Sequence, residues 1–413
     1  MNLLTVIIAI IVFLAVIWIL VAVLLYARKK LVPEKKVKVH VNKEKSYDAD
    51  YGTTLLQSLS DQKIYVPSAC GGGGTCGTCK GIILSGGGDI LPTEKTHIDH
   101  KLEKEHYRLF CQVKVKNEME VELPPEILGV KKWECEVVHN KNVATYIKEL
   151  VLKLPDNEKL NFRSGSYIQI DAPKTKIDFK NFQVEEQFRR EWEELGIFDQ
   201  VMKNSDPTTR AYSLANPPAD NDNLVLNVRI ALPPFNPKKQ KFKSVNPGIV
   251  SSYIFALNPG DKVILSGPYG DFFLRDTDNE KMFIGGGAGM APLRSHIFHL
   301  FKTLHFQGKT TFWYGGRSLR ELFYREEFDA LQRDVENFSF HVALSEPKPE
   351  DQWNGNTGFI HQVIFEQYLK NHPAPEEIEY YICGPPLMLQ AVRTMLDRLG
   401  VPENMILFDD FGS

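Results

Sequence analysis

The stretch Ser68-Ala-Cys-Gly-Gly-Gly-Gly-Thr-Cys-Gly-Thr-Cys79 decides the fold, because it places three cysteines in one glycine-rich loop. A fourth cysteine follows at a distance, in Leu109-Phe-Cys-Gln-Val113. Thiolates are soft ligands, and a group of four favours zinc or an iron–sulfur cluster. The candidate metal ligands are Cys70, Cys76, Cys79 and Cys111.

The spacing of these cysteines distinguishes the two kinds of site. Structural zinc sites usually present two separate C-x2-C pairs. Plant-type ferredoxins carry C-x4-C-x2-C and a distant fourth cysteine. Here the first gap is one residue longer, and the glycines allow the loop to wrap closely around a bulky cluster. A Rieske centre is disfavoured because the chain has no Cys-x-His pair. The pattern predicts a [2Fe–2S] ferredoxin-like domain, with a structural zinc site as the alternative.

Length and composition set the outer limits. A chain of 413 residues is long enough for two or three domains with substantial cores. The net charge of −3 offers no electrostatic case for binding nucleic acid. Two of the six cysteines, Cys135 and Cys383, remain outside the candidate cluster, and nothing indicates a disulfide framework. A reducing compartment fits this usage, and we expect Cys135 to be a packed strand residue.

The N-terminal segment is expected to anchor the chain in a membrane. Residues 3–26 are almost wholly apolar and carry no charge. A helix of this length spans the hydrocarbon core, about 30 Å thick. A cleaved signal peptide would have a charged start and a shorter apolar run, and a core helix apolar on every face would be unusual at this position. Positive charge follows in Ala27-Arg-Lys-Lys30, Lys35 and Lys36, which predicts that the rest of the chain lies on the cytoplasmic side. The expected transmembrane helix covers residues 1–27.

Residues 36–128 are expected to form a small α+β unit around the cysteines. Alternation predicts strands at 36–41, 113–116 and 119–123, and a turn at Tyr51 enters a short helix. Three histidines lie between the third and fourth cysteines, and a solvated surface explains them better than a metal site. They are His97, His100 and His106.

Residues 131–275 show short β-like segments separated by proline, glycine and asparagine, which predicts an antiparallel β-barrel. Within them, Arg210-Ala-Tyr-Ser213 could place an aromatic ring and a hydroxyl against a flavin, with arginine on a phosphate. Gly248-Ile-Val-Ser-Ser-Tyr253 enters a helix whose N–H groups could bind a pyrophosphate. Taken alone, such a tetrapeptide is more often an ordinary strand with a surface arginine.

An insertion at 174–203 interrupts the barrel pattern. Its apolar residues recur at helical spacing, which indicates a helix packed on its own domain. The alternative is a docking surface for partner subunits. The stripe consists of Val184, Phe188, Trp192, Leu195 and Phe198.

Residues 278–413 alternate strands and helices, which predicts a doubly wound parallel sheet. The module opens with Lys281-Met-Phe-Ile-Gly-Gly-Gly-Ala-Gly-Met-Ala-Pro-Leu-Arg-Ser295, a strand, a glycine turn and a helix with Pro292 near its start. This arrangement brings a helix N-terminus up to a nucleotide's phosphates. The acidic ribose-binding residue of the standard fingerprint is not evident, and NADH is the expected nucleotide with NADPH as the alternative.

In this order, the motifs resemble the family of F subunits of the sodium-translocating NADH:quinone oxidoreductases. The resemblance covers the membrane helix, the C-x5-C-x2-C loop, R-x-Y-S, G-x-x-S, GGGAGMAP, the C-G-P-P turn and the ending Leu407-Phe-Asp-Asp-Phe-Gly-Ser413. It implies an NADH dehydrogenase subunit in the bacterial inner membrane. Hydride would pass from NADH to FAD, and single electrons to the [2Fe–2S] cluster, to partner membrane subunits and to ubiquinone.

The resemblance also implies roles for individual residues. Those implied for FAD are Arg210, Tyr212, Ser213, Gly248, Ser251 and Ser252. Those implied for the nicotinamide nucleotide are Gly285, Gly287, Gly289, Gly384 and Pro385. Cys383 would lie close to the nicotinamide, although a small buried strand residue explains it equally well. Phe411 would cover the second face of the flavin. The implied catalytic set is Tyr212, Ser213, Cys383 and Phe411.

Two other functions are compatible with parts of this pattern. A membrane-tethered NADH-dependent reductase feeding an oxygenase would carry the same three modules, although such reductases normally need no membrane anchor. A non-enzymatic membrane-tethered protein that binds zinc would be colourless. A flavin and iron–sulfur absorption spectrum would exclude it.

Overall fold

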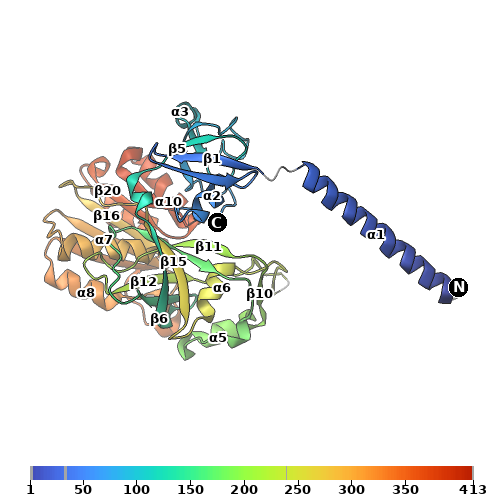
Figure 1. Ribbon diagram of the computed structural model, residues 1–413. Helices are drawn as coiled ribbons and strands as arrows, with labels where there is room; N and C mark the ends of the chain where they lie inside the picture. Colours follow the sequence, from blue (N-terminus) through green and yellow to red (C-terminus); the bar gives the residue numbers. More distant parts are fainter. Residues whose placement is uncertain (1–2, 32–34, 239, 412–413) are drawn as a thin grey trace. The chain divides into compact units, whose positions relative to one another are not determined.

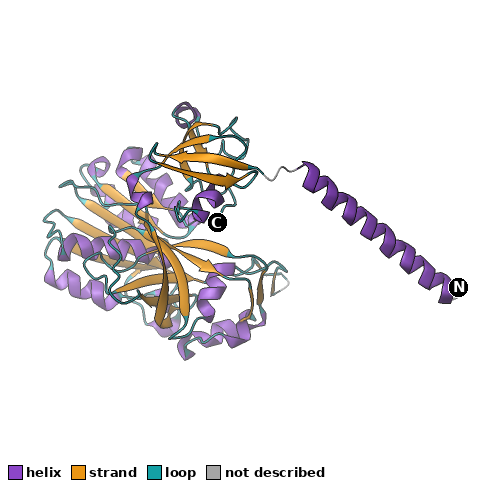
Figure 2. Ribbon diagram, in the orientation of Figure 1, coloured by secondary structure: helices purple, strands orange, loops and turns teal. Residues whose placement is uncertain are grey.

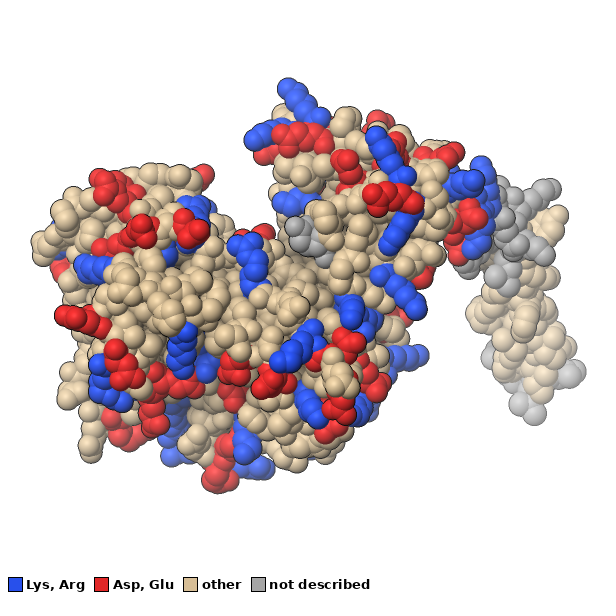
Figure 3. All heavy atoms as spheres, turned by 60° about the vertical axis from the view of Figure 1, so that its left-hand side comes forward, with Lys and Arg blue, Asp and Glu red and all other residues tan. Residues whose placement is uncertain are grey.

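The computed structural model describes residues 3–31, 35–238 and 240–411. Within them the chain forms two compact units, one of residues 1–66 and 72–129 and one of residues 67–71 and 130–413. Figure 1 labels their helices and strands. On the face in view in Figure 3, basic and acidic side chains are interspersed, as the small net charge leads one to expect.

Helix α1 (Leu3–Leu31) carries no charged residue before Arg28. Its segment Val6–Leu24 has a mean hydropathy of 3.5 and none of it is buried. That length and composition are sufficient to cross a membrane. The side chains of Arg28, Lys29 and Lys30 lie outside the described residues, as do Gly412 and Ser413 at the other end of the chain.

The first unit contains a five-stranded sheet in the order β2-β1-β5-β3-β4, in which only β1 and β5 pair in parallel. Val37, Val39 and Val41 of β1 point into the core while the lysines between them face solvent. The expected α+β unit is therefore present. Its elements are β1 (Lys36–Val41), β2 (Lys45–Asp50), α2 (Leu55–Asp61), β3 (Lys80–Ser85), α3 (His100–Lys104), β4 (Tyr107–Leu109), β5 (Met119–Glu122) and α4 (Pro125–Leu128).

The strand expected at 113–116 is wrong. Only Lys114 makes a bridge, to Thr54, and the segment otherwise has no ladder. Its backbone instead serves the turn that enters α2: Leu55 N–H donates to Val113 O at 2.9 Å, and Gly52 N–H to Val115 O at 2.7 Å. Val113 and Val115 both point into the core beside this turn. Two buried residues separated by one position give the same alternation as a strand, although the segment is not one.

The barrel is a six-stranded antiparallel sheet in the order β11-β8-β15-β6-β7-β12, and a bridge between Leu214 and Leu226 joins its two ends. The antiparallel barrel is confirmed, and Cys135 is a fully buried strand residue in it, as expected. Its strands and helix are β6 (Lys131–Ala144), β7 (Ile147–Lys153), β8 (Tyr167–Ala172), β11 (Thr208–Ser213), β12 (Asn223–Arg229), α6 (Ile249–Ala256) and β15 (Lys262–Tyr269).

The insertion forms a hairpin of β9 (Thr175–Asp178) and β10 (Val201–Asn204) that encloses helix α5 (Glu186–Glu194). Phe188 and Trp192 on α5 are buried in the barrel core, and the Trp192 indole donates to Thr145 O at 2.7 Å. The apolar stripe packs on its own domain. The helix ends at Glu194, short of Phe198, because Gly196 takes a left-handed conformation with φ 65°.

The last domain is a six-stranded parallel sheet in the order β19-β18-β17-β16-β20-β21. Met282 and Ile284 of β16 face one hydrophobic layer and Phe283 faces another, so both faces of the sheet are covered (Figure 2). This confirms the doubly wound architecture. Its elements are β16 (Lys281–Gly286), α7 (Met290–Lys302), β17 (Thr310–Gly316), α8 (Arg325–Asp334), β18 (Phe338–Leu344), β19 (Asn356–Thr357), α9 (Ile360–Gln367), β20 (Glu379–Cys383), α10 (Pro386–Arg398) and β21 (Ile406–Asp409).

Candidate functional site

Three of the four candidate cysteines lie together in the first unit. The pKa of the Cys79 thiol is raised because it hydrogen-bonds with Cys111, is buried, and lies close to Cys111 and Cys76. The fourth, Cys70, belongs to residues 67–71, which group with the second unit. No three His, Cys, Asp or Glu side chains of the described residues are placed to hold a single metal ion. A [2Fe–2S] cluster differs, because it shares four thiolates between two irons.

The cysteine loop is shaped by glycines whose backbone conformation other residues rarely adopt. Gly74 and Gly77 have positive φ, and a Cβ would lie 2.6 Å from Gln112 at the first and 2.8 Å from His97 at the second. His97 is thus a wall of the loop. His100 pairs with Glu103 on the surface and His106 is exposed, so these two histidines lie on a solvated surface as expected.

A buried ion pair that the sequence pattern did not reveal holds the chain next to Cys111. Glu94 is fully buried, and Arg108 donates to it at 2.7 Å. The same carboxylate accepts the backbone N–H of Leu109 at 2.9 Å. Arg108 also donates to the carbonyl oxygens of Gly87, Gly88 and Asp89. A single pair therefore fixes the loop between the third and fourth cysteines.

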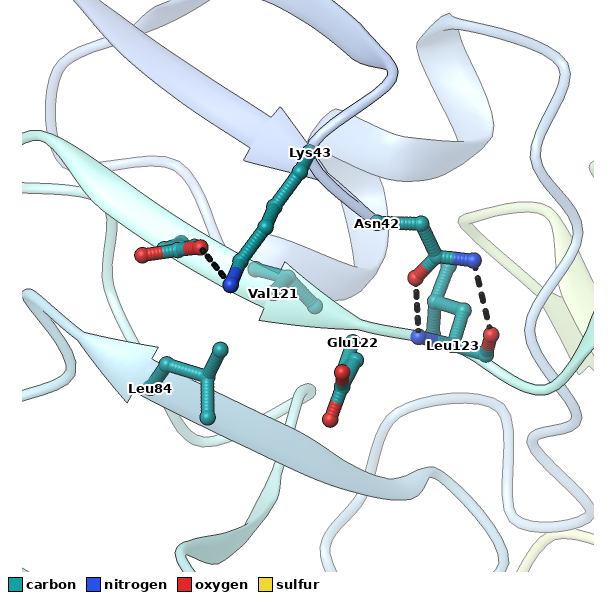
Figure 4. Close-up of a pocket in the computed structure, with 7 residues that line it drawn as sticks. Asn42, Lys43, Leu84, Val121, Glu122 and Leu123 are labelled. Atoms are coloured by element: carbon teal, nitrogen blue, oxygen red, sulfur yellow. Dashed lines mark hydrogen bonds and ion pairs between the residues drawn. The ribbon is translucent and has the colours of Figure 1, made fainter.

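The hollow that Figure 4 shows is a different feature of this unit. It has a volume of about 380 Å³ and lies along β5. The Asn42 side chain closes one end by donating to Leu123 O and accepting from Leu123 N–H, and Lys43 pairs with Glu120 at 3.9 Å. Asn42, Lys43 and Glu120 are each engaged by a neighbouring residue, so these groups do not form an organised ligand site.

In the barrel, Arg210, Tyr212 and Ser213 all lie on β11. Arg210 Nη1 donates to Thr209 O at 2.7 Å and to Cys70 O at 3.0 Å. Tyr212 is half-buried, and burial raises the pKa of its hydroxyl. Residues 210 and 212 share one face of the strand, since side chains alternate along it.

The chain enters helix α6 at Ile249 with Gly248 as the N-cap residue, as expected, and no side chain caps its first turn. Ser252 Oγ donates to Gly248 O at 2.6 Å, while Ser251 Oγ accepts from Ala231 N–H at 3.2 Å. Both serines are buried, so their hydroxyls shape the turn. The backbone N–H groups at the start of this helix are the groups that suit a pyrophosphate.

The glycine turn between β16 and α7 lies at the carboxyl edge of the parallel sheet. Gly287 has φ 57° and a Cβ there would meet nothing within 4 Å. At Gly289, by contrast, a Cβ would lie 2.1 Å from Cys383 O, so this glycine allows the turn to pass directly over the end of β20. A Cβ at Gly285 would crowd Leu293 of α7 at 2.8 Å.

Strands β16 and β20 are neighbours, although the chain runs outward through β17, β18 and β19 before it returns. Such a reversal of strand order opens a crevice at the carboxyl edge, where nucleotides bind in this kind of sheet. Cys383, Gly384 and Pro385 stand at the end of β20, and Cys383 is fully buried. Burial and the nearby Asp409 and Asp410 raise the pKa of its thiol.

Asp409 is the functional candidate that sequence reasoning missed. It is the register partner of Cys383 and accepts a hydrogen bond from Ser213 Oγ at 3.0 Å. Burial, with contributions from Asp271 and Asp410, raises its pKa to about 7, although the Ser213 hydrogen bond acts the other way. Phe411, two residues further, is 48% exposed. The structure thus joins Ser213, Cys383 and Asp409 at one edge.

These surroundings fit the groups that the sequence implied. The first unit offers clustered thiols in a glycine loop. In the second unit, β11 offers an aromatic ring beside an arginine, and α6 an uncapped N-terminus. The crevice offers bare backbone at Gly287. Fold and site together define an iron–sulfur flavoprotein reductase that uses a nicotinamide nucleotide.

Comparison with known families agrees with this class domain by domain. A 2Fe-2S iron-sulfur cluster binding domain matches residues 39–116, an oxidoreductase FAD-binding domain residues 196–274, and an oxidoreductase NAD-binding domain residues 283–394. Among solved structures, an Amycolatopsis cytochrome P450 reductase has a TM-score of 0.62 at 23% identity, covering 91% of this chain and 98% of its own. The ferredoxin reductase of carbazole 1,9a-dioxygenase has a TM-score of 0.58 at 22% identity, covering 92% and 99%. At these identities the likeness is one of fold.

Curated relatives are much closer in sequence. The Na(+)-translocating NADH-quinone reductase F subunit of Neisseria gonorrhoeae is 51% identical over 407 residues, covering 98% of this chain and 99% of the relative. The protein of that name in Klebsiella pneumoniae is 52% identical over 409 residues, covering 98% and 99%. The chain belongs to the family of Na(+)-translocating NADH-quinone reductase F subunits. The resemblance drawn from the motifs is confirmed.

Proposed function

We propose that this chain is the electron-input subunit of a respiratory sodium-pumping NADH:quinone oxidoreductase. With FAD bound, hydride from NADH would be accepted by the flavin, and single electrons would pass to the [2Fe–2S] cluster, to partner membrane subunits and to ubiquinone. The observation that carries this proposal is the end-to-end similarity to relatives of that name, at 51% and 52% identity. The three matched domains supply the groups that such a transfer requires.

The site residues take the following roles in this proposal. Cys70, Cys76, Cys79 and Cys111 hold the cluster. Arg210, Tyr212, Ser213 and the turn of Gly248, Ser251 and Ser252 bind FAD. Gly285, Gly287, Gly289, Gly384 and Pro385 form the walls of the nucleotide crevice. Cys383 and Phe411 lie at its flavin side.

The group at the crevice whose pKa is shifted toward neutrality is the Asp409 carboxyl. When bound, FAD supplies the step between a two-electron hydride donor and a one-electron cluster. Ser213 orients Asp409 through the hydrogen bond of 3.0 Å. A carboxylate with a pKa near 7 changes its charge at physiological pH. It can therefore offset the positive charge that appears on the nicotinamide when hydride leaves.

We place α1 across the bacterial inner membrane and the two globular units on its cytoplasmic side. The length and hydropathy of Val6–Leu24 support the span. The basic residues Arg28, Lys29 and Lys30 in the last turn of the helix, with Lys35 and Lys36 next in the chain, support the orientation. NADH is available to the two units on that side.

The test is NADH oxidation by native membrane vesicles, with and without sodium, from wild type and from a strain lacking the gene. A sodium-stimulated, quinone-dependent rate that disappears with the gene is the expected result. A rate that stays the same would overturn the pump assignment and favour a reductase feeding an oxygenase.

A second measurement separates the cofactors. The Cys79→Ser variant should lose the iron–sulfur absorption bands and quinone reduction, yet retain NADH oxidation with an artificial acceptor that draws electrons directly from FAD. Wild-type protein without any visible absorption would instead indicate a zinc site.

A further inference from the structure

The insertion helix α5 contacts the nucleotide-binding domain through one carboxylate. Glu191 lies one residue before Trp192. The Trp192 side chain is buried in the barrel core and fixes the orientation of the helix. Glu191 Oε1 accepts from the Tyr146 hydroxyl at 2.6 Å and from Arg317 Nη2 at 2.5 Å. Lys348 Nζ lies 3.9 Å from its other oxygen. A side chain of the barrel insertion thus binds two basic residues of the nucleotide domain.

Arg317 has an informative place in the parallel sheet. It directly follows β17, the second strand of the domain and the neighbour of β16 with its glycine turn. In nucleotide-binding sheets of this kind, the residues after the second strand reach the ribose that carries the 2′ substituent. An acidic residue there accepts the 2′-hydroxyl of NADH, and an arginine there binds the 2′-phosphate of NADPH. By position alone, Arg317 indicates NADPH.

The surroundings of Arg317 indicate the opposite preference. Its guanidinium is held by Glu191, lies 3.8 Å from Glu321, and stacks over the Tyr146 ring with 5.9 Å to the ring centre. The side chain of Glu191 is 15% exposed and that of Arg317 is 41% exposed. Burial would raise the pKa of Glu191, but the hydrogen bonds from Tyr146 and Arg317 lower it below its ordinary value. Glu191 is therefore anionic at neutral pH.

The charges at this corner are balanced without a ligand. Two cations, Arg317 and Lys348, face the carboxylates of Glu191 and Glu321. A 2′-phosphate carries about −1.5 to −2 charges and needs donors with a free positive excess. It would have to break the Glu191–Arg317 pair and leave the Glu191 carboxylate facing the negative phosphate. A 2′-hydroxyl is neutral and meets no such penalty.

We propose that Glu191 is a specificity-determining residue that sets the preference for NADH over NADPH by engaging Arg317. The inference rests on the proposed nucleotide crevice and adds to it a determinant that comes from the barrel insertion. In this arrangement Glu191 of the insertion occupies the guanidinium of Arg317, which could otherwise bind a phosphate. The same arrangement accounts for the absence of an evident acidic residue soon after the glycine turn, because Glu191 precedes that turn by nearly a hundred positions.

The test compares the Glu191→Gln variant of the full-length detergent-solubilised chain with wild type. The ratio of kcat/KM for NADPH to that for NADH is measured with an artificial electron acceptor. We expect this ratio to rise by about tenfold or more, the size of one charge-assisted hydrogen bond. Calorimetry with 2′,5′-ADP and with 5′-AMP gives a readout independent of turnover. Binding of 2′,5′-ADP should tighten, while binding of 5′-AMP should change little.

Two controls make the outcome decisive. In the double variant Glu191→Gln/Arg317→Ala, the gain in 2′,5′-ADP binding should disappear. Glu194→Gln, on the exposed side of α5 and paired with Arg190 of the same helix, should leave the ratio unchanged. An unchanged ratio in Glu191→Gln, or an equal fall in both kcat/KM values, would overturn the inference. A wild-type protein that oxidises neither nucleotide would overturn the proposed function itself.

Discussion

Ser213 Oγ donates a hydrogen bond of 3.0 Å to Asp409 Oδ2, and so joins the last residue of barrel strand β11 to the last residue of β21. The two residues are 196 positions apart in the chain. The strand that carries the proposed flavin ligands is thereby coupled to the edge of the sheet that holds the nucleotide crevice. A substitution of Asp409 should therefore affect both strand β11 and the nucleotide crevice.

The raised pKa of Asp409 predicts a pH-dependent stability. Its folded pKa of about 7 lies above its unfolded value of about 3.9, so the folded chain binds more protons between these values. Its contribution is fully present below the unfolded pKa and is lost as pH rises through 7. Asp409→Asn should therefore raise the Tm at pH 8 by about 2 °C or more, and raise it by less at pH 5, where only part of the contribution has been lost. Thermal unfolding of the purified chain at both pH values is the measurement.

The control for this prediction is Asp206→Asn, a change at an exposed aspartate. It should leave the Tm unaffected at either pH. Equal shifts for Asp409→Asn at pH 5 and pH 8 would show that the carboxyl does not titrate as inferred.

Removing the buried carboxylate of Glu94 should lower the stability of the ferredoxin-like unit. Glu94→Gln leaves Arg108 buried without its charge partner, a change that costs about 3–5 kcal/mol in comparable sites. We expect the denaturant concentration at which the visible iron–sulfur absorption disappears to fall. Glu103→Gln, which alters a surface pair with His100, is the matched control. If both variants lose absorption at the same midpoint as wild type, Glu94 does not hold the loop.

A second buried pair, Lys281 with Glu379, should show strong energetic coupling. The two residues are register partners on β16 and β20, lie 2.9 Å apart and are nearly inaccessible. Glu379→Gln alone should cost about 3–5 kcal/mol, because it leaves a buried ammonium group uncompensated. Lys281→Met/Glu379→Gln should cost less than the sum of the single changes. Urea unfolding of all four proteins gives the coupling, and simple additivity would refute it.

Two neighbouring glycines should respond differently to substitution. Gly289→Ala drives a Cβ to within 2.1 Å of Cys383 O, so it should destabilise the domain and abolish NADH oxidation. Gly287→Asn should fold normally, because asparagine tolerates a φ of 57° and a Cβ at this position meets no atom within 4 Å. Its side chain enters the proposed crevice, so KM for NADH should rise at an unchanged Tm. Unaltered KM would remove Gly287 from the nucleotide site.

Much of the architecture could be predicted because it depends on local patterns. The alternating residues of β1, the glycine turn after β16 and the apolar helix α1 all lie where the residue pattern indicates. The hydrophobic period and the local composition are properties of a few neighbouring residues, so elements that depend on them can be recognised from the sequence alone. The failure at 113–116 has the same origin, since a turn that buries two valines has the period of a strand.

The contacts that tune the site could not be predicted in this way. Asp409 is recognisable only once β21 is placed beside β20, and Glu94 only once Arg108 is folded against it. The partner of Arg317 comes from an inserted helix in another domain. Each of these depends on pairing between distant segments, for which a single sequence carries no periodic signal.

The position of β21 has a consequence for biosynthesis. The strand is the last described element of the chain, yet it supplies Asp409 to a site whose other members, Ser213 and Cys383, are translated earlier. The barrel and most of the parallel sheet can fold while the chain is still attached to the ribosome, but the crevice gains Asp409 only once β21 has been synthesised. A chain that ends before β21 would therefore keep most of its core and lose the titratable carboxyl of Asp409.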